Sequence, residues 1–154
     1  DATNQGRAIN VLVQAGLVTL REEDLLNPAP ADIDTDASQV SVIPVDAAQT
    51  TAVFHEGRPA VINNSFLERA GIDPLDAIFQ DDPNTKQAEP YINVWVTTPE
   101  RADDETINRL TELWKDDAVT EAIMESSGNT AVKVDRPRED LEEIMQRLGQ
   151  SGDQ

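Results

Sequence analysis

The sequence contains no cysteine, a single histidine and few basic residues, and each shortage excludes a class of function. Without cysteine the chain forms no disulfide and offers no thiol nucleophile or thiolate metal ligand. The lone histidine, His55, excludes a zinc site built from several histidines of one chain, and it has no recognisable partner motif for catalysis. Only 12 lysines and arginines face 30 aspartates and glutamates, and the net charge of −18 argues against nucleic acid and anionic membrane surfaces as partners.

Long apolar runs and aromatic residues are also scarce. No apolar stretch approaches the roughly 20 residues of a membrane span. Aromatic residues make up 4% of the chain, so a core would be built mainly from alanine, valine, isoleucine and leucine. The 154 residues suffice for one sizeable domain or two small lobes. Most of the acidic residues are interpreted as solvated faces and helix starts rather than as metal ligands.

Apolar periodicity and turn residues predict an alternation of helices and strands. We expect helices over 4–15, 46–54 and 63–70, two more between 103 and 128, and a last one beginning at Pro137. The expected strands are 39–45, 59–62, 76–80, 91–96 and 130–134, and residues 149–154 are expected to fray. Gly16 and Gly71 should close helices in the left-handed conformation. The pattern indicates an α/β architecture with a largely parallel or mixed sheet.

The first turn of the first helix has the composition of an anion site. Asn4 and Arg7 are three residues apart and therefore share a helix face, and Thr3 is a reasonable N-cap. Free N–H groups, the positive end of the helix dipole, an amide and a guanidinium together suit a carboxylate, which arginine can hold with two parallel bonds. The alternative is that Arg7 is a solvated surface cation and that Asn4 is a helix cap.

Two further asparagines lie where an α/β fold would place ligand-binding groups. Asn63 ends the expected strand 59–62, and polar residues at the carboxyl ends of strands point into the ligand crevice of such folds. Asn93 lies within the apolar run 91–96, where a buried amide must find a hydrogen-bond partner. Their alternatives are a helix cap for Asn63 and a structural amide for Asn93.

Ordered motifs give the chain a resemblance to a known family. They are Thr3-Asn4-Gln5-Gly6-Arg7, Val45-Asp46-Ala47-Ala48-Gln49, Ala60-Val61-Ile62-Asn63-Asn64, Ala70-Gly71-Ile72-Asp73-Pro74 and Tyr91-Ile92-Asn93-Val94. In this order they resemble the NlpA/MetQ family of methionine-binding lipoproteins of bacterial ABC importers. The motifs span about the first 100 residues, and the stretch after Trp95 agrees in pattern more than in motif.

The resemblance implies a function and a set of residues. The fold would be α/β and like the type II periplasmic binding proteins, in which two lobes close over an amino acid. Asn4, Arg7, Asn63 and Asn93 would hold the carboxylate and amino group of methionine or a similar small amino acid. The partners would be an ABC permease and its ATPase at the extracytoplasmic face of the membrane. No catalytic residue, metal or cofactor is implied, so the chain is not expected to be an enzyme.

The family pattern is longer than this chain, and this sets the expected domain organisation. Residues 1–90 are assigned to the second lobe and 91–154 to a segment that returns to the first lobe, with residues 135–154 as an extra acidic helix. We therefore expect a fragment with weak or no binding of its own. A rival hypothesis is an interaction module without ligand, whose apolar segment 91–96 pairs between chains to give an oligomer.

Overall fold

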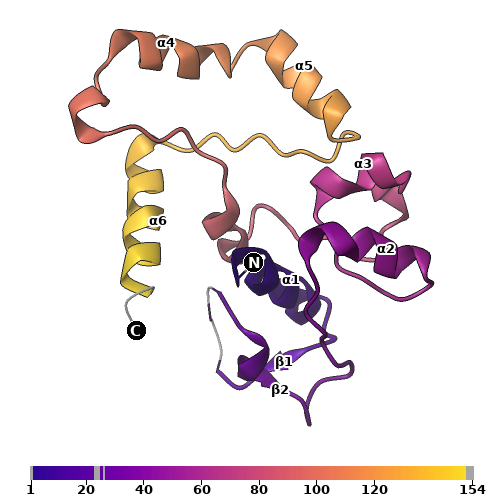
Figure 1. The fold of residues 1–154 in the computed structure, drawn as a ribbon. Helices are drawn as coiled ribbons and strands as arrows, with labels where there is room; N and C mark the ends of the chain where they lie inside the picture. The colour runs from indigo at the N-terminus through magenta and orange to yellow at the C-terminus, as the bar shows by residue number, and fades with distance from the viewer. Residues whose placement is uncertain (1, 23–24, 26, 152–154) are drawn as a thin grey trace. The chain divides into compact units, whose positions relative to one another are not determined.

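The computed structural model describes residues 2–22, 25 and 27–151. The chain divides into two compact units, which are described separately (Figure 1). Unit 1 combines the residues up to Tyr91 with those from Val134 onward, and unit 2 consists of Ile92–Lys133. The assignment of 1–90 and 91–154 to two lobes of a binding protein stays a prediction.

Unit 1 is built from two longer helices, one near each end of the chain, and several short ones. Its α-helices are α1 (Ala2–Gln14), α2 (Thr50–His55), α3 (Leu67–Ala70) and α6 (Arg138–Ser151). Its 3₁₀ helices are η1 (Pro30–Asp32), η2 (Ala47–Gln49), η3 (Asn64–Phe66), η4 (Pro74–Asp76) and η5 (Lys86–Tyr91). No helix in the described part of the chain is both long enough and apolar enough to cross a membrane.

The sheet is much smaller than the sequence predicts. Strands β1 (Thr19–Leu20) and β2 (Ile33–Asp34) pair antiparallel, with Thr19 opposite Asp34 and Leu20 opposite Ile33. Among the described residues no other strand is present. The predicted strands over 39–45, 59–62, 76–80, 91–96 and 130–134 are therefore wrong.

The reason for this difference is the lack of hydrogen-bonding neighbours. A β-strand is completed by the ladder it forms with an adjacent strand, and β-branched composition alone does not supply one. Ile43 and Val96 keep 66% and 71% of their surface exposed, which shows that these segments pack against little. They have the composition of strands, but no described segment of their own unit pairs with them.

The apolar core of unit 1 forms between α1 and the β1–β2 pair. Ile9 is fully buried and packs with Val18 and Ile33. Leu12 and Val13 follow Ile9 at the spacing of three and four residues that defines one helix face, and both pack at the edge of this cluster. The core thus fixes the orientation of α1 about its own axis.

Several predicted helix ends are confirmed. Gly16 and Gly71 adopt positive φ angles of 70° and 67°, and each follows the end of a helix as expected. The Asp46 side chain accepts a hydrogen bond from the Ala48 amide and so caps η2, although the helix expected over 46–54 is divided between η2 and α2. Residues 149–151 continue α6 and do not fray, whereas 152–154 lie outside the described residues.

Unit 2 consists of η6 (Pro99–Arg101), α4 (Glu105–Leu113) and α5 (Asp117–Ser126). Asp104 and Asp116 cap the two α-helices by accepting hydrogen bonds from amides in their first turns. Trp95 meets Trp114 edge to face, with ring centroids 5.9 Å apart. Both indoles are more than half exposed, so this pair is a surface contact within the unit.

Replacing Ile9 with alanine should destabilise unit 1 by about 2–4 kcal/mol, because the substitution leaves a cavity in a small core. Urea denaturation followed by circular dichroism measures the change. Ile78→Ala is the matched control, since Ile78 is 98% exposed, and it should leave the free energy of unfolding almost unchanged. Equal effects of the two substitutions would contradict the position of the core.

Candidate functional site

The predicted anion-binding residues lie on the first turns of α1, which begins one residue earlier than the proposed cap. Helix α1 starts at Ala2, so Thr3 lies inside it and the prediction of Thr3 as N-cap is wrong. Asn4 and Arg7 do belong to one helix, and their spacing puts them on one face, as expected. Gly6 between them lies against Asn27, where a Cβ would overlap the Asn27 side-chain amide. The glycine therefore lets the chain pass close to α1 beside the site.

Asn63 and Asn4 form an amide pair between distant segments of unit 1. The Asn63 Nδ2 donates to the Asn4 Oδ1 at 2.9 Å, and both side chains are partly buried. Asn63 stands at the N-cap position of η3, but its side chain makes no capping hydrogen bond. The alternative of a side-chain helix cap is therefore wrong for Asn63, whose side chain reaches α1 instead.

Arg7 is held by a carboxylate that sequence reasoning missed. Its Nε and Nη2 both lie 2.9 Å from the Asp81 Oδ2, and the Arg7 and Asp81 side chains are 38% and 23% exposed. The interpretation of Arg7 as a solvated cation is wrong, because the guanidinium is ion-paired. Asp81 belongs to the polar loop 80–90, where acidic residues next to one another gave no signal to separate Asp81 from Asp82.

Tyr91 covers one face of the same guanidinium. The Arg7 Cζ lies 5.3 Å from the centroid of the Tyr91 ring, within the range of a cation–π interaction. Burial raises the pKa of the Tyr91 hydroxyl and the negative charge of Asp81 adds to the rise, while Asn10 and Arg7 act in the opposite direction.

These groups together suit a small zwitterion. Arginine donors match a carboxylate, and amide or carboxylate oxygens accept from an ammonium group. In the described ranges, no cluster of three or more histidine, cysteine, aspartate or glutamate side chains is arranged to hold a metal ion. His55 is the last residue of α2 and is exposed, with its Nε2 3.2 Å from the Ala70 carbonyl oxygen.

Asn93 differs from the prediction in its local structure. It belongs to unit 2, within the segment 91–96 that was expected to be a strand. Its side chain is exposed and the backbone around it forms no ladder, so the interpretation as a buried structural amide within a strand is wrong. Its role in ligand binding stays a prediction.

The fold is that of substrate-binding proteins. The structure matches the crystal structure of protein PG110 from Staphylococcus aureus with a TM-score of 0.82 and 29% identity, over 96% of this chain and 58% of that one. It also matches the substrate-binding protein of a methionine transporter from Streptococcus pneumoniae, with a TM-score of 0.67 and 25% identity over 84% of this chain and 50% of that one. The predicted α/β fold class is confirmed by these neighbours, although its sheet is small.

The sequence places the chain in a family. The family model of the NlpA lipoproteins matches residues 1–134, and the chain belongs to this family. The D-methionine-binding lipoprotein MetQ of Salmonella typhi is 29% identical over 136 residues, which cover 86% of this chain and 49% of MetQ. The chain thus spans about half the length of the curated relatives it matches.

The environment of Tyr91 gives a direct test of the site, because it is the chain's only tyrosine. Ultraviolet titration of the folded protein should give a tyrosine pKa above the ordinary 10.0, and in urea the midpoint should return to that value. Because the folded pKa is raised, the stability that neutral Tyr91 contributes is fully present below pH 10.0 and is lost as pH rises through the folded pKa.

Asp81→Asn should lower this midpoint, since it removes a negative charge that disfavours tyrosinate. Asp76→Asn removes the same charge from an exposed position on η4 and serves as the control. An ordinary tyrosine pKa in the folded chain, or equal shifts in the two variants, would show that Tyr91 and Asp81 are not placed around Arg7 as described.

Proposed function

We propose that this chain forms part of the substrate-binding component of an ABC importer and that its site in unit 1 binds methionine or a similar small amino acid. The observation that carries the proposal is the convergence of Arg7 on α1 with the amide pair of Asn4 and Asn63. The names of the relatives, a D-methionine-binding lipoprotein and a methionine transporter's binding protein, support the ligand class. Binding, rather than catalysis, is the activity proposed.

The charges at the site favour a zwitterion over a simple carboxylate. Arg7 is already balanced by Asp81, so a ligand with a carboxylate alone would add an uncompensated negative charge. An amino acid brings its own ammonium group, which can donate hydrogen bonds to the side-chain oxygens of Asn4 and Asn63 and to the Asp81 carboxylate. Asn93 of unit 2 is proposed as a fourth residue that contacts the amino-acid head group.

The proposal extends to the partners and the location of the whole protein. A permease and its ATPase are the proposed partners, and the cell envelope is the proposed location, because the relatives are named as lipoproteins. The apolar side chains that remain exposed along 40–45 and 94–96 support the expectation that further protein surface completes the two lobes. Binding by this chain alone is therefore expected to be weak.

Titration of L- and D-methionine into the isotope-labelled chain, followed by nuclear magnetic resonance, tests the site. Methionine should perturb the side-chain amides of Asn4 and Asn63 in a saturable way. Arg7→Ala should weaken binding roughly tenfold to hundredfold, because a charge-assisted hydrogen bond contributes about 1.5–3 kcal/mol. Arg58→Ala, at an exposed position, is the matched control and should have no effect.

The absence of any saturable change up to the solubility limit of methionine would contradict binding by this chain. Equal weakening by Arg7→Ala and Arg58→Ala would instead contradict the placement of the ligand at Arg7. A comparison of the two enantiomers then shows whether the site distinguishes L- from D-methionine.

A second candidate function is an assembly module without ligand, and one observation favours it. Val94, Trp95 and Val96 are 41%, 58% and 71% exposed in a segment with strand-forming composition. Such a segment is suited to pairing with its copy in another chain. Oligomerisation through this segment is therefore proposed as the alternative.

Light scattering over a range of concentrations distinguishes this alternative. An assembly module should show a mass of at least twice 16.9 kDa, and Val96→Lys should return it to the monomer. Ile78→Lys adds the same charge at another exposed apolar residue and should leave the assembly intact. A monomer at all concentrations rules the alternative out.

A further inference from the structure

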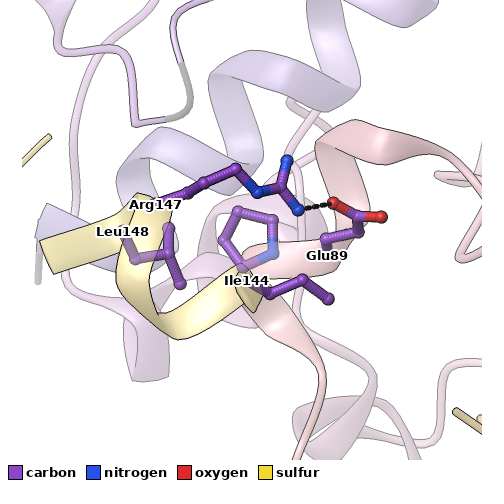
Figure 2. Close-up of a pocket in the computed structure, with 5 residues that line it drawn as sticks. Glu89, Ile144, Arg147 and Leu148 are labelled. Carbon is purple, nitrogen blue, oxygen red and sulfur yellow. Dashed lines mark hydrogen bonds and ion pairs between the residues drawn. The ribbon is translucent and has the colours of Figure 1, made fainter. Parts of the chain in front are cut away.

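The C-terminal helix lies beyond the part of the chain that matches the family, yet it belongs to unit 1. The family match ends at residue 134, and α6 begins at Arg138. Ile144 of α6 is only 6% exposed, and Ala88 of η5 is 9% exposed. Pro90 of η5 and Leu148 of α6 line the same small open pocket as Ile144 (Figure 2). Helix α6 is therefore packed on η5.

The carboxylate of Glu89 joins η5 to α6 and to the segment just before α6. The Glu89 Oε1 accepts a hydrogen bond from the Arg136 Nη1 at 2.8 Å, and its Oε2 accepts one from the Arg147 Nη2 at 2.6 Å. Figure 2 shows Arg147 reaching from α6 to this carboxylate. The Glu89 side chain is only 13% exposed, which distinguishes its two ion pairs from solvent-exposed ones. The Arg147 hydrogen bond, followed by that of Arg136, lowers the pKa of Glu89 despite the opposing effect of burial.

The same short helix carries Tyr91, two residues after Glu89. Pro90 stands between them, and its ring fixes its own φ angle and restricts the backbone of the residue before it. Pro90 thus limits the backbone freedom between Glu89 and Tyr91. Tyr91 in turn lies under the Arg7 guanidinium, and a hydrogen bond from the Ala88 amide to the Thr85 carbonyl closes the turn that leads into this segment.

We propose that α6 is a positioning element for the ligand site: through Glu89 it holds η5 in place and so keeps Tyr91 beneath Arg7. Glu89, Arg136 and Arg147 are then positioning residues that act on Arg7 without touching the ligand. The consequence for binding rests on the function proposed above, whereas the link from α6 to Tyr91 does not. A segment outside the family's pattern would thus set the orientation of a residue within it.

The charge reversal Glu89→Lys tests this link, because it places a cation against two arginines. The pKa of Tyr91 should fall towards its ordinary value of 10.0, because a displaced η5 leaves the hydroxyl less buried. Hydrogen exchange at the Ala88 and Tyr91 amides should accelerate at least about tenfold, because both charge-assisted hydrogen bonds of Glu89 are lost and each contributes about 1.5–3 kcal/mol. The triple variant with all three charges reversed, Glu89→Lys with Arg136→Glu and Arg147→Glu, should restore both the tyrosine pKa and the exchange rates.

Glu142→Lys is the matched control. It makes the same change on α6 at an exposed ion pair with Arg138, and it should leave the Tyr91 titration unchanged. An unchanged Tyr91 titration in Glu89→Lys overturns the proposal, as does an equal shift in Glu142→Lys. Faster exchange of the α1 amides in Glu89→Lys would mean that the variant unfolds more widely. The neutral variant Glu89→Gln is then measured instead, by tyrosine titration and hydrogen exchange. An unchanged tyrosine pKa in Glu89→Gln overturns the proposal.

Methionine titration of the same variants separates this inference from the proposed function. If the unmodified chain binds methionine, Glu89→Lys should weaken binding while Glu142→Lys does not, and equal affinities of the two variants overturn the link to the ligand site. If the unmodified chain does not bind methionine, the proposed function of the chain fails, and the tyrosine titration alone decides whether α6 positions Tyr91.

Discussion

The partly buried positive charge of Arg7 needs a negative partner, and this need determines how the segment 81–91 contacts α1. The guanidinium is more than half covered, so its charge must be matched by acceptors that the fold supplies. Asp81 supplies the charge and Tyr91 the apolar face, and both come from the segment that follows η4. Helix α1 and this segment are thus held together by the ion pair of Arg7 with Asp81 and by the contact of the guanidinium with Tyr91.

The position of α1 depends on a second constraint, which is the small core beneath it. Ile9, buried between Val18 and Ile33, sets which face of the helix points inward. Asn4 and Arg7 then have a fixed direction, because their spacing from Ile9 is set by the helical period. A short strand pair and one helix are enough to aim the site residues, even though the sheet is far smaller than the sequence predicts.

Features that neighbouring residues determine, such as helix ends, were predicted correctly from the sequence. Features that need a contact with a residue far along the chain, such as strands and ion pairs, were not. Gly16 and Gly71 end helices because only a residue tolerant of positive φ fits there, and a single position shows this. Asn63 was assigned to the site both from its position after an expected strand and from the family motifs; that strand is absent, but the Asn63 side chain does contact Asn4. Asp81 and Glu89 were missed, since nothing in an acidic polar loop indicates which carboxylate meets an arginine far along the chain. The predicted strands failed for the same reason: segment 91–96 has the right residues but no neighbour within its own unit.

The family match ends at residue 134, whereas unit 1 extends to the end of the chain. The contacts of α6 give a physical reason for this difference. Residues 1–134 carry the pattern of the NlpA lipoproteins, but unit 1 resumes at Val134 and includes α6. The charge balance explains the contact that α6 makes with η5. In a chain with 30 acidic and 12 basic side chains, a partly buried glutamate needs a cation brought to it, and Arg136 and Arg147 bring two. Helix α6 and the segment that leads into it therefore satisfy a carboxylate within the region that the family model matches, next to the tyrosine that lies against Arg7.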